Sequence, residues 1–461
     1  MWGVDARLHP DEALFAAQAR LIPADPLLRT TDLDKPPLTF YATALSFAAF
    51  GPTEWAARLP NLFASILSLA VLYRLVRALY AQHAVALIAL LLWACAPYDL
   101  AFAATVFTDV QATLWVLVAC LLAITDRWRG AGIAAALLFA SKPTALLFLP
   151  LIAALGIAHQ AKPGWNARDM LRRLWALAWP LGVGLALLVL WDQARAPRSF
   201  FELGYTRNDP GRLIRSDEVW PRLEAWGHWL RFVTGAPLAN ALLALAGGWG
   251  LACGLRGNPT RRALQDWLIA GFALAFLAWH WLVAFNTYDR YLHTLVPLLL
   301  ILAARGLALT LNPSPKWRGG RGVRASILAL IMTITLPSIA QTLRGEAAIG
   351  GDQGQHQGID RLADYLNRDL AGEVVYDHWL GWELAFYLGE TPQVTPRYVS
   401  LPEALADDVA QSPHETRYLL APSAEEAAFW LEILAGAGIA AETIYVDNFM
   451  VYRLTPALYS R

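Results

Sequence analysis

Charged residues are scarce in this sequence. Of its 461 residues, only 16% are Asp, Glu, Lys or Arg, whereas 57% are hydrophobic and the mean hydropathy is +0.38. This composition excludes an ordinary soluble protein and fits a chain with many membrane spans. The formal net charge is zero, so no global positive charge attracts nucleic acid. We therefore predict an integral membrane protein that contacts membrane lipids and no nucleic acid.

Cysteine is also rare. The three cysteines, Cys95, Cys120 and Cys253, lie in apolar runs and show no CxxC or Cys/His spacing. This excludes a disulfide framework and a cysteine metal site. The sequence also lacks a P-loop and a Rossmann-type glycine motif, so nothing in it indicates nucleotide binding.

Long apolar runs take the place of charge. Because one span needs roughly 20 apolar residues, we predict about ten spans. They lie near residues 59–79, 83–98, 108–125, 131–142, 143–158, 174–191, 237–255, 266–285, 292–309 and 325–342. The short fourth and fifth segments flank Lys142-Pro143 and are predicted to be broken helices, which are tolerated where they line a cavity.

Arginine and lysine gather on alternate loops of this map. Short cytoplasmic loops retain positive charge, so the pattern predicts an even number of crossings with both termini outside the cytoplasm. Residues 312–320, rich in Pro, Gly, Lys and Arg, are predicted to be a flexible cytoplasmic linker. Residues 1–8 form neither a span nor a leader peptide. We therefore expect that a first transmembrane helix is missing from the chain as written.

Two domains are predicted. Residues 1–342 would form the transmembrane domain, in which 1–58 are a first outer loop with juxtamembrane helices, and residues 343–461 an extracytoplasmic α/β domain. In the latter we expect a helix near 359–370, strands near 373–376, 417–421, 443–445 and 450–454, and an N-cap at Ser423. Asp377-His378-Trp379 either contacts substrate or packs at a strand end.

Charged side chains at the outer side are the candidate site. A carboxylate can take a proton, and cations can neutralise phosphate oxygens. Charges near hydrocarbon are costly and usually functional. Helix capping, loop solvation and snorkelling to the interface remain alternative roles. The candidates are Asp11 and Glu12, then Asp34, Lys35, Arg58, Asp109 and Lys142, and finally Tyr288, Arg290 and Tyr291.

The order of these motifs resembles the GT-C membrane glycosyltransferases of the protein O-mannosyltransferase and lipid A aminoarabinose transferase superfamily. The motifs are Asp11-Glu12, Asp34-Lys35-Pro36-Pro37, Arg58-Leu59-Pro60, Thr108-Asp109, Ser141-Lys142-Pro143 and Tyr288-Asp289-Arg290-Tyr291. They cover roughly residues 9–310. The resemblance implies a polytopic α-helical fold and transfer of a hexosyl or pentosyl group from a polyprenyl phosphate donor to a lipid, glycan or protein acceptor. It also implies Asp11 as general base and Lys35 as the donor phosphate contact.

Inversion at the sugar carbon fits this assignment, because a base on the acceptor side would act opposite a phosphate leaving group held by cations. A divalent cation between Glu12 and Asp109 is one further possibility. The expected location is the bacterial inner membrane, with the active site outside. A lipid or solute transporter, or a membrane sensor that uses the C-terminal domain, are the alternatives. A transporter is expected to show repeated halves, and the sequence shows no convincing repeat.

Overall fold

The computed structural model describes residues 6–162, 165–197, 199–208, 211–256, 260–310, 320–412 and 414–456. The chain forms two compact units. The first contains residues 21–351. The second combines residues up to 20 with residues from 352 onward. The segment that precedes the membrane helices in the sequence thus packs with the C-terminal part of the chain. The predicted linker at 312–320 lies, except for its last residue, outside the described residues.

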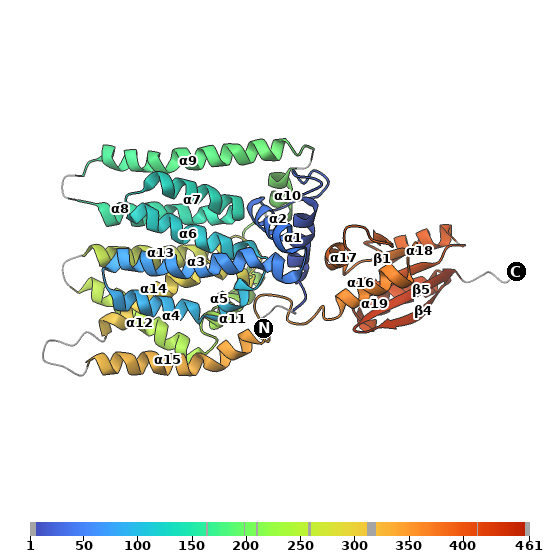
Figure 1. The fold of residues 1–461 in the computed structure, drawn as a ribbon. Helices are drawn as coiled ribbons and strands as arrows, with labels where there is room; N and C mark the ends of the chain where they lie inside the picture. Colours follow the sequence, from blue (N-terminus) through green and yellow to red (C-terminus); the bar gives the residue numbers. More distant parts are fainter. Residues whose placement is uncertain are drawn as a thin grey trace. The chain divides into compact units, whose positions relative to one another are not determined.

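The first unit is built from helices, many of which run side by side (Figure 1). They are α2 (Leu38–Phe50), α3 (Glu54–Tyr80), α4 (His83–Ala94), α5 (Pro97–Ala103), α6 (Thr108–Ile124), α7 (Trp128–Ser141), α8 (Leu149–Gln160), α9 (Ala167–Gln193), α10 (Phe200–Asn208), α11 (Val219–Leu230), α12 (Pro237–Leu255), α13 (Arg261–Leu282), α14 (Val296–Thr310) and α15 (Gly320–Leu343). Short 3₁₀ helices connect some of them: η1 (Pro143–Phe148), η2 (Ser216–Glu218), η3 (Arg231–Val233) and η4 (Asp289–Leu292).

Five described helices are long and apolar enough to cross a membrane: α3, α9, α12, α13 and α15. The pair α4 and α5, bent by 54°, adds a sixth span if it counts as one. The predicted count of about ten is not confirmed. Several predicted spans, among them 108–125 and 292–309, form apolar helices of only 10–17 residues. The long apolar helices identify an integral membrane protein.

The predicted break at Lys142-Pro143 is confirmed. Helix α7 ends at Ser141, Lys142 is extended (φ −153°, ψ 118°), and η1 begins at Pro143. Proline disfavours a helical conformation in the residue before it, and its own fixed φ suits the start of a new helix. The break therefore places the Lys142 side chain between two helix ends.

Helices α12 and α14 approach closely through glycine. A Cβ atom at Gly306 would lie 1.7 Å from the backbone oxygen of Ala246, and one at Gly250 would lie 3.1 Å from the Cα of Gly306. Small residues allow helix backbones to meet in membranes, where packing rather than the hydrophobic effect drives association.

The second unit contains a five-stranded sheet in the order β2-β1-β3-β5-β4. β1 is parallel to β2 and β3, whereas β5 is antiparallel to β3 and β4. The elements are α1 (Pro10–Leu21, its last residue in the first unit), α16 (Ile359–Asp369), β1 (Val374–Asp377), α17 (Gly381–Tyr387), β2 (Thr395–Tyr398), α18 (Pro402–Gln411), β3 (Arg417–Ala421), α19 (Ala424–Gly436), β4 (Ile439–Val446) and β5 (Phe449–Pro456).

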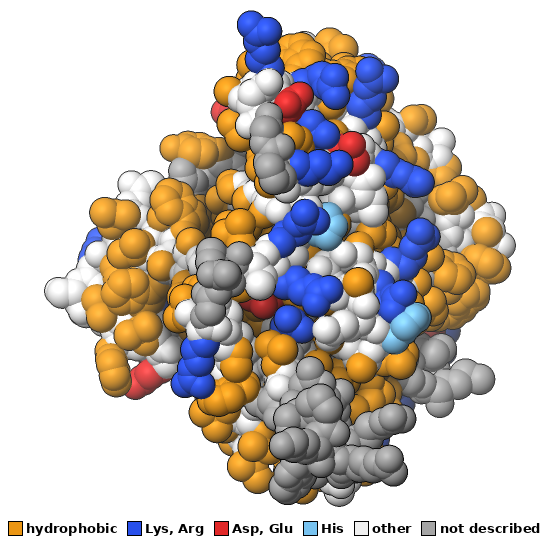
Figure 2. All heavy atoms as spheres, turned by 90° about the vertical axis from the view of Figure 1, so that its left-hand side faces the viewer, with side chains coloured by type: hydrophobic (Ala, Val, Ile, Leu, Met, Phe, Trp, Pro, Cys, Tyr) orange, Lys and Arg blue, Asp and Glu red, His pale blue; other side chains and the backbone are white. Residues whose placement is uncertain are grey.

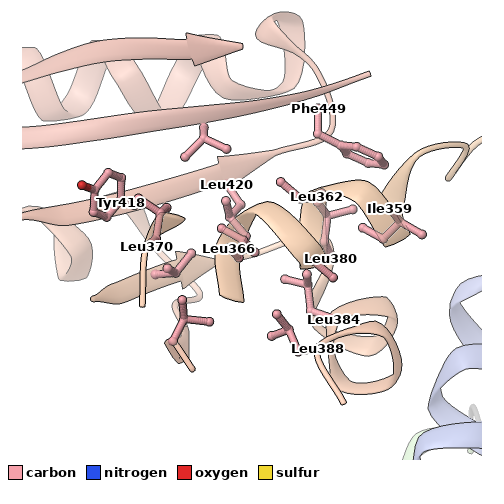
Figure 3. Packing of buried hydrophobic residues seen from close by; sticks show 14 residues of the cluster. Ile359, Leu362, Leu366, Leu370, Leu380, Leu384, Leu388, Tyr418, Leu420 and Phe449 are labelled. Carbon is pink, nitrogen blue, oxygen red and sulfur yellow. The ribbon is translucent and has the colours of Figure 1, made fainter. Parts of the chain in front are cut away.

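Each face of this sheet carries its own apolar core. Leu366 of α16 and Leu384 of α17 pack with Leu420 in one cluster (Figure 3). Leu405 of α18 and Leu434 of α19 pack with Leu419 in the other. Successive side chains of a strand point to opposite faces, which explains why the neighbours Leu419 and Leu420 enter different cores.

The elements predicted for this unit are largely confirmed. The helix at 359–370 and the strand at 417–421 match α16 and β3. The Ser423 side chain caps α19 by accepting a hydrogen bond from the backbone N–H of Glu426 at 3.2 Å. The sequence did not reveal α17, β2 or α18.

Candidate functional site

An ion pair between Asp109 and Lys142 lies at the ends of two neighbouring helices. Asp109 occupies the first turn of α6, and Lys142 follows the last residue of α7. The Lys142 Nζ donates a hydrogen bond to Asp109 Oδ1. The two side chains are only 11% and 4% exposed, so a low-dielectric surrounding strengthens their attraction. The aromatic ring of Tyr291 covers the ammonium, with its centroid 4.4 Å from Nζ.

A small pocket opens beside this pair. It contains about 270 Å³ of empty space, part of it open to solvent. Its lining residues are Asp109, Lys142, Thr144, Phe148, Phe276, His280, Tyr291 and Thr294. The pocket therefore combines an anion, a cation and hydroxyl groups with an apolar wall, as expected for a site that orients a polar ligand.

Two more cations belong to the same region. Lys35 and Arg290 are close enough to Lys142 to repel its charge. The Lys35 Nζ lies 2.7 Å from Asp34 Oδ2, and the Arg290 guanidinium lies over the rings of Phe107 and Tyr288 at 5.1 Å and 4.9 Å. Three cations near one pocket form an environment that favours a phosphate.

The apolar wall of the pocket is fixed by an arginine. Arg222 of α11 donates hydrogen bonds to the backbone oxygens of His280, Trp281, Val283 and Phe285, at 2.5–3.2 Å. His280 and Trp281 lie in the last turn of α13, where carbonyl groups lack partners further along the helix, whereas Val283 and Phe285 follow the helix. Helix α11 thus holds the His280 end of α13 in place.

Buried polar side chains brace the helices behind the pocket. Thr113 Oγ1 lies 2.8 Å from His293 Nδ1 and 3.0 Å from Thr294 Oγ1. Asn61 donates to the backbone oxygens of Thr105 and Phe107 at 2.8 Å and 2.7 Å. These bonds hold the loop before α6, and with it Asp109, against α3. Arg58, one turn before Asn61, is buried at 5% exposure.

Asp289 ties the loop of Arg290 to the end of the first unit. It accepts hydrogen bonds from the backbone N–H groups of Gly350 at 3.0 Å and Arg290 at 2.7 Å. Burial raises the pKa of Asp289, and these hydrogen bonds oppose the rise. Asp289 therefore orients the loop, whereas Tyr288, at 44% exposure, faces outward.

Asp11 and Glu12 belong to the second unit, in the first turn of α1. Glu12 is fully buried and accepts a hydrogen bond from the backbone N–H of His9 at 3.1 Å, as a carboxylate does at a helix start. Asp11 is partly exposed. The expected approach of Asp11 to Lys35, Asp109 and Arg290 stays a prediction.

The residues suggested for a divalent cation do not fit that role. Asp109 is engaged by Lys142, and Glu12 by the backbone of His9. Within the described ranges, no group of three or more His, Cys, Asp or Glu side chains is arranged to hold a metal ion.

Asp377 has a local structural role. Its Oδ1 accepts hydrogen bonds from the backbone N–H groups of Trp379 and Leu380, at 3.1 Å and 2.7 Å, at the start of α17. His378 packs against Trp379 and Trp430. These contacts fit the packing interpretation of the Asp377-His378-Trp379 cluster.

Sequence reasoning missed His280, Thr113, His293, Asn61 and Arg222. A usable signal existed for the first four, since each is a polar residue within or beside an apolar run. Arg222 lies between two predicted spans, in a stretch where arginines and acidic residues are nearly equal in number. Nothing in the sequence distinguishes it from the neighbouring arginines.

Part of the chain matches a known family. Residues 34–191 match the model of the dolichyl-phosphate-mannose-protein mannosyltransferase family. This range includes Asp34, Lys35, Arg58, Asp109 and Lys142. None of the curated proteins matches the chain.

Solved structures share the fold over nearly the whole chain. The first is ArnT from Cupriavidus metallidurans in the apo state, with a TM-score of 0.69, 17% identity and coverage of 98% of this chain and 95% of that chain. The same protein bound to undecaprenyl phosphate gives a TM-score of 0.66 at 14% identity, covering 99% and 96%. The apo oligosaccharyltransferase of Archaeoglobus fulgidus gives 0.54 at 12% identity, covering 98% and 71%.

The family match and the shared fold together confirm that this chain resembles the GT-C membrane glycosyltransferases of the protein O-mannosyltransferase and lipid A aminoarabinose transferase superfamily.

Proposed function

We propose that this protein is a glycosyltransferase that moves a sugar from a polyprenyl phosphate donor to a lipid, glycan or protein acceptor at the outer face of a bacterial inner membrane. The observation that carries the proposal is Lys142, which lines the pocket beside Asp109, together with Lys35 and Arg290, which lie near enough to Lys142 to act on its charge. The ArnT structure bound to undecaprenyl phosphate supports a phosphorylated polyprenyl ligand.

The cations act on the leaving group. An acceptor hydroxyl oxygen attacks the anomeric carbon, the bond from that carbon to the phosphate oxygen breaks, and the lipid phosphate leaves with one more negative charge. Lys35, Lys142 and Arg290 stabilise this charge as it develops in the transition state. Because charge builds up only as the bond breaks, the same cations favour the transition state over the bound donor.

Asp11 is the proposed base. It takes the proton of the attacking hydroxyl, and attack opposite the departing phosphate inverts the configuration at the sugar carbon. A carboxylate oxygen can accept this proton. Partial exposure of Asp11, in contrast to the buried Glu12, supports this choice between the two neighbouring acids.

Transfer assays with the purified, reconstituted chain test the base. The substrates are labelled polyprenyl phosphate sugars offered with a membrane extract as acceptor. We expect Asp11→Asn to lower the transfer rate about 100-fold or more, in the range of general base catalysis. Asp407→Asn, an exposed acid of the same unit, is the matched control. Full transfer by Asp11→Asn would disprove the role of Asp11.

Donor binding is tested separately. We expect Lys35→Ala to weaken the affinity for an undecaprenyl phosphate probe about tenfold, which corresponds to the loss of one charge-assisted hydrogen bond. Lys162→Ala, which removes an exposed lysine, should leave the affinity unchanged. Equal affinity of Lys35→Ala and the unchanged protein, measured by competition with labelled lipid, would rule out the phosphate contact.

A further inference from the structure

A second and larger pocket lies at the other ends of the helices that carry Asp109 and Lys142. Helix α6 starts at the Asp109 end and stops just before this pocket, whereas α7 starts in it and ends at Lys142. The 17 residues of α6 span about 25 Å at the α-helical rise. The pocket encloses about 940 Å³ of space, part of it open to solvent. It is therefore separate from the proposed catalytic site.

Arginine dominates the lining of this pocket. The residues are Asp126, Arg127, Trp128, Arg129, Gly130, Arg172, Arg173 and Ala176. Figure 2 shows Lys and Arg side chains gathered on the face formed by these helix ends. Four guanidinium groups against one carboxylate give a strongly positive pocket, and guanidinium geometry matches phosphate oxygens.

One arginine is fixed by contacts within the protein. Arg173 Nε lies 3.1 Å from Asp126 Oδ1 and 3.0 Å from Gln160 Oε1, and its guanidinium lies 4.4 Å from the ring centroid of Trp165. The Trp128 Nε1 also donates to Asp126 Oδ1, at 3.0 Å. The carboxylate that lines this pocket is therefore already paired with Arg173 through Oδ1.

The charges of the other three arginines are available to a ligand. Arg127, Arg129 and Arg172 are exposed, and in the described part of the chain no carboxylate forms an ion pair with them. Arginines whose only role is to set the orientation of a membrane protein do not have to line the same pocket. Here three of them surround one space, and the N-terminus of α7, which has no side-chain cap, adds its positive dipole end.

An apolar surface adjoins the pocket along α9. Trp175 and Trp179 follow Arg172 at spacings of three and seven residues, which places all three on one face of the helix. The two tryptophans are 68% and 43% exposed, and α9 is long enough to cross the membrane. A ligand with an anionic head in the pocket can lay an apolar tail along this face.

We propose that this pocket binds the phosphate headgroup of an anionic glycerophospholipid, with the acyl chains along the Trp175 and Trp179 face of α9. The site does not depend on the proposed transfer reaction. Positive pockets beside membrane helices attract anionic headgroups, and each basic residue near the membrane surface adds to the attraction.

Lipid retention and thermal stability test this site. The full chain is purified in a neutral detergent, and bound lipid is measured by native mass spectrometry after addition of phosphatidylglycerol, phosphatidylcholine or inorganic phosphate. We expect retention of phosphatidylglycerol and a rise in unfolding temperature with this lipid alone. The triple variant Arg127→Gln/Arg129→Gln/Arg172→Gln should bind phosphatidylglycerol at least about tenfold more weakly.

A matched control separates the pocket from general charge. Arg74→Gln/Arg256→Gln/Arg261→Gln removes three exposed arginines from elsewhere in the basic loops and should retain phosphatidylglycerol. Equal loss in both triple variants, equal retention of phosphatidylcholine, or stabilisation by inorganic phosphate alone would overturn the proposal. If the pocket triple variant does not fold, each of its single substitutions is compared with Arg74→Gln, and equal binding would overturn it as well.

Discussion

The ion pair of Asp109 and Lys142 sets the electrostatics of the candidate pocket. Because each charge is already balanced by the other, the pocket does not hold an uncompensated cation before a ligand arrives. An anion that enters the pocket must then compete with Asp109 for Lys142. Asp109 and Lys142 were each predicted from the sequence as site residues, but not as partners. They are 33 positions apart in the chain, and only the packing of α6 against α7 brings them together.

Breaking this pair should be costly. We expect Lys142→Met to lower the free energy of unfolding by about 3–5 kcal/mol, because Asp109 is left buried without its partner. The double variant Asp109→Asn/Lys142→Met should recover part of this loss. Denaturant titration in mixed micelles compares the unchanged protein, Lys142→Met, Asp109→Asn and the double variant, with Lys162→Met as the control. Strictly additive effects of the two single substitutions would contradict the coupling.

Helix packing in the first unit depends on glycine at one crossing. Gly306 of α14 has no room for a side chain against the Ala246 carbonyl of α12, whereas Gly248 of the same α12 faces open space. Of these two glycines in similar apolar helices, Gly248 thus has room for a side chain and Gly306 does not. The sequence shows both as glycines in predicted spans and does not distinguish them, since the difference lies in the neighbouring helix.

We expect Gly306→Ala to destabilise the protein by about 1–3 kcal/mol, the usual range for overpacking. Gly248→Ala should be neutral or slightly stabilising, because alanine has the higher helix propensity. Thermal unfolding in detergent compares the two variants with the unchanged protein. A similar loss of stability in both would show that the close approach of α12 and α14 is not what Gly306 provides.

Elements with a strong apolar pattern could be predicted, and those without one could not. The buried strand β3 and the helix α16, with its apolar face, were found from the sequence. Strand β2, Thr395–Tyr398, is exposed at every position and pairs only at the edge of the sheet, so no apolar alternation marks it. The apolar helices α6 and α7 lie close to the predicted segments 108–125 and 131–142.

Buried titratable side chains make the stability of the second unit depend on pH. Asp352, His356 and Glu383 form a buried chain of contacts in which His356 Nδ1 bonds Asp352 and His356 Nε2 lies 3.1 Å from Glu383 Oε1. Burial raises the pKa of Glu383 from 4.5 to about 7. Burial lowers the pKa of His356, but the hydrogen bond with Asp352 and the charge of Glu383 outweigh it and raise this pKa.

Both shifts predict a loss of stability at higher pH. Between pH 4.5 and 7 the folded unit keeps the Glu383 proton that the unfolded chain has lost, so stability falls as pH rises through this window. The His356 contribution is complete below pH 6.5 and is lost as pH rises through its raised folded pKa. Buried Asp377, whose pKa is raised by burial, adds in the same direction.

We expect a higher unfolding temperature of the second unit at pH 5 than at pH 8. The difference corresponds to a free energy on the order of 2–3 kcal/mol. Glu383→Gln should remove most of this dependence, and Glu403→Gln, an exposed control, should not. Tryptophan fluorescence during heating follows the transition. An unfolding temperature that rises from pH 5 to pH 8 would contradict the proposed role of Glu383.

Because Arg222 binds four carbonyls at the end of α13, the segment around α11 and the wall of the candidate pocket form a single structural assembly. The shape of this wall therefore depends on two segments of the chain and cannot be exchanged by transplanting one of them. A chimaera that imports residues 200–235 from a relative without an arginine at this place would release the end of α13 and loosen the pocket beside Asp109. Recombination between relatives would therefore have to keep α11 and α13 together. Engineering of the pocket would likewise have to change both helices at once.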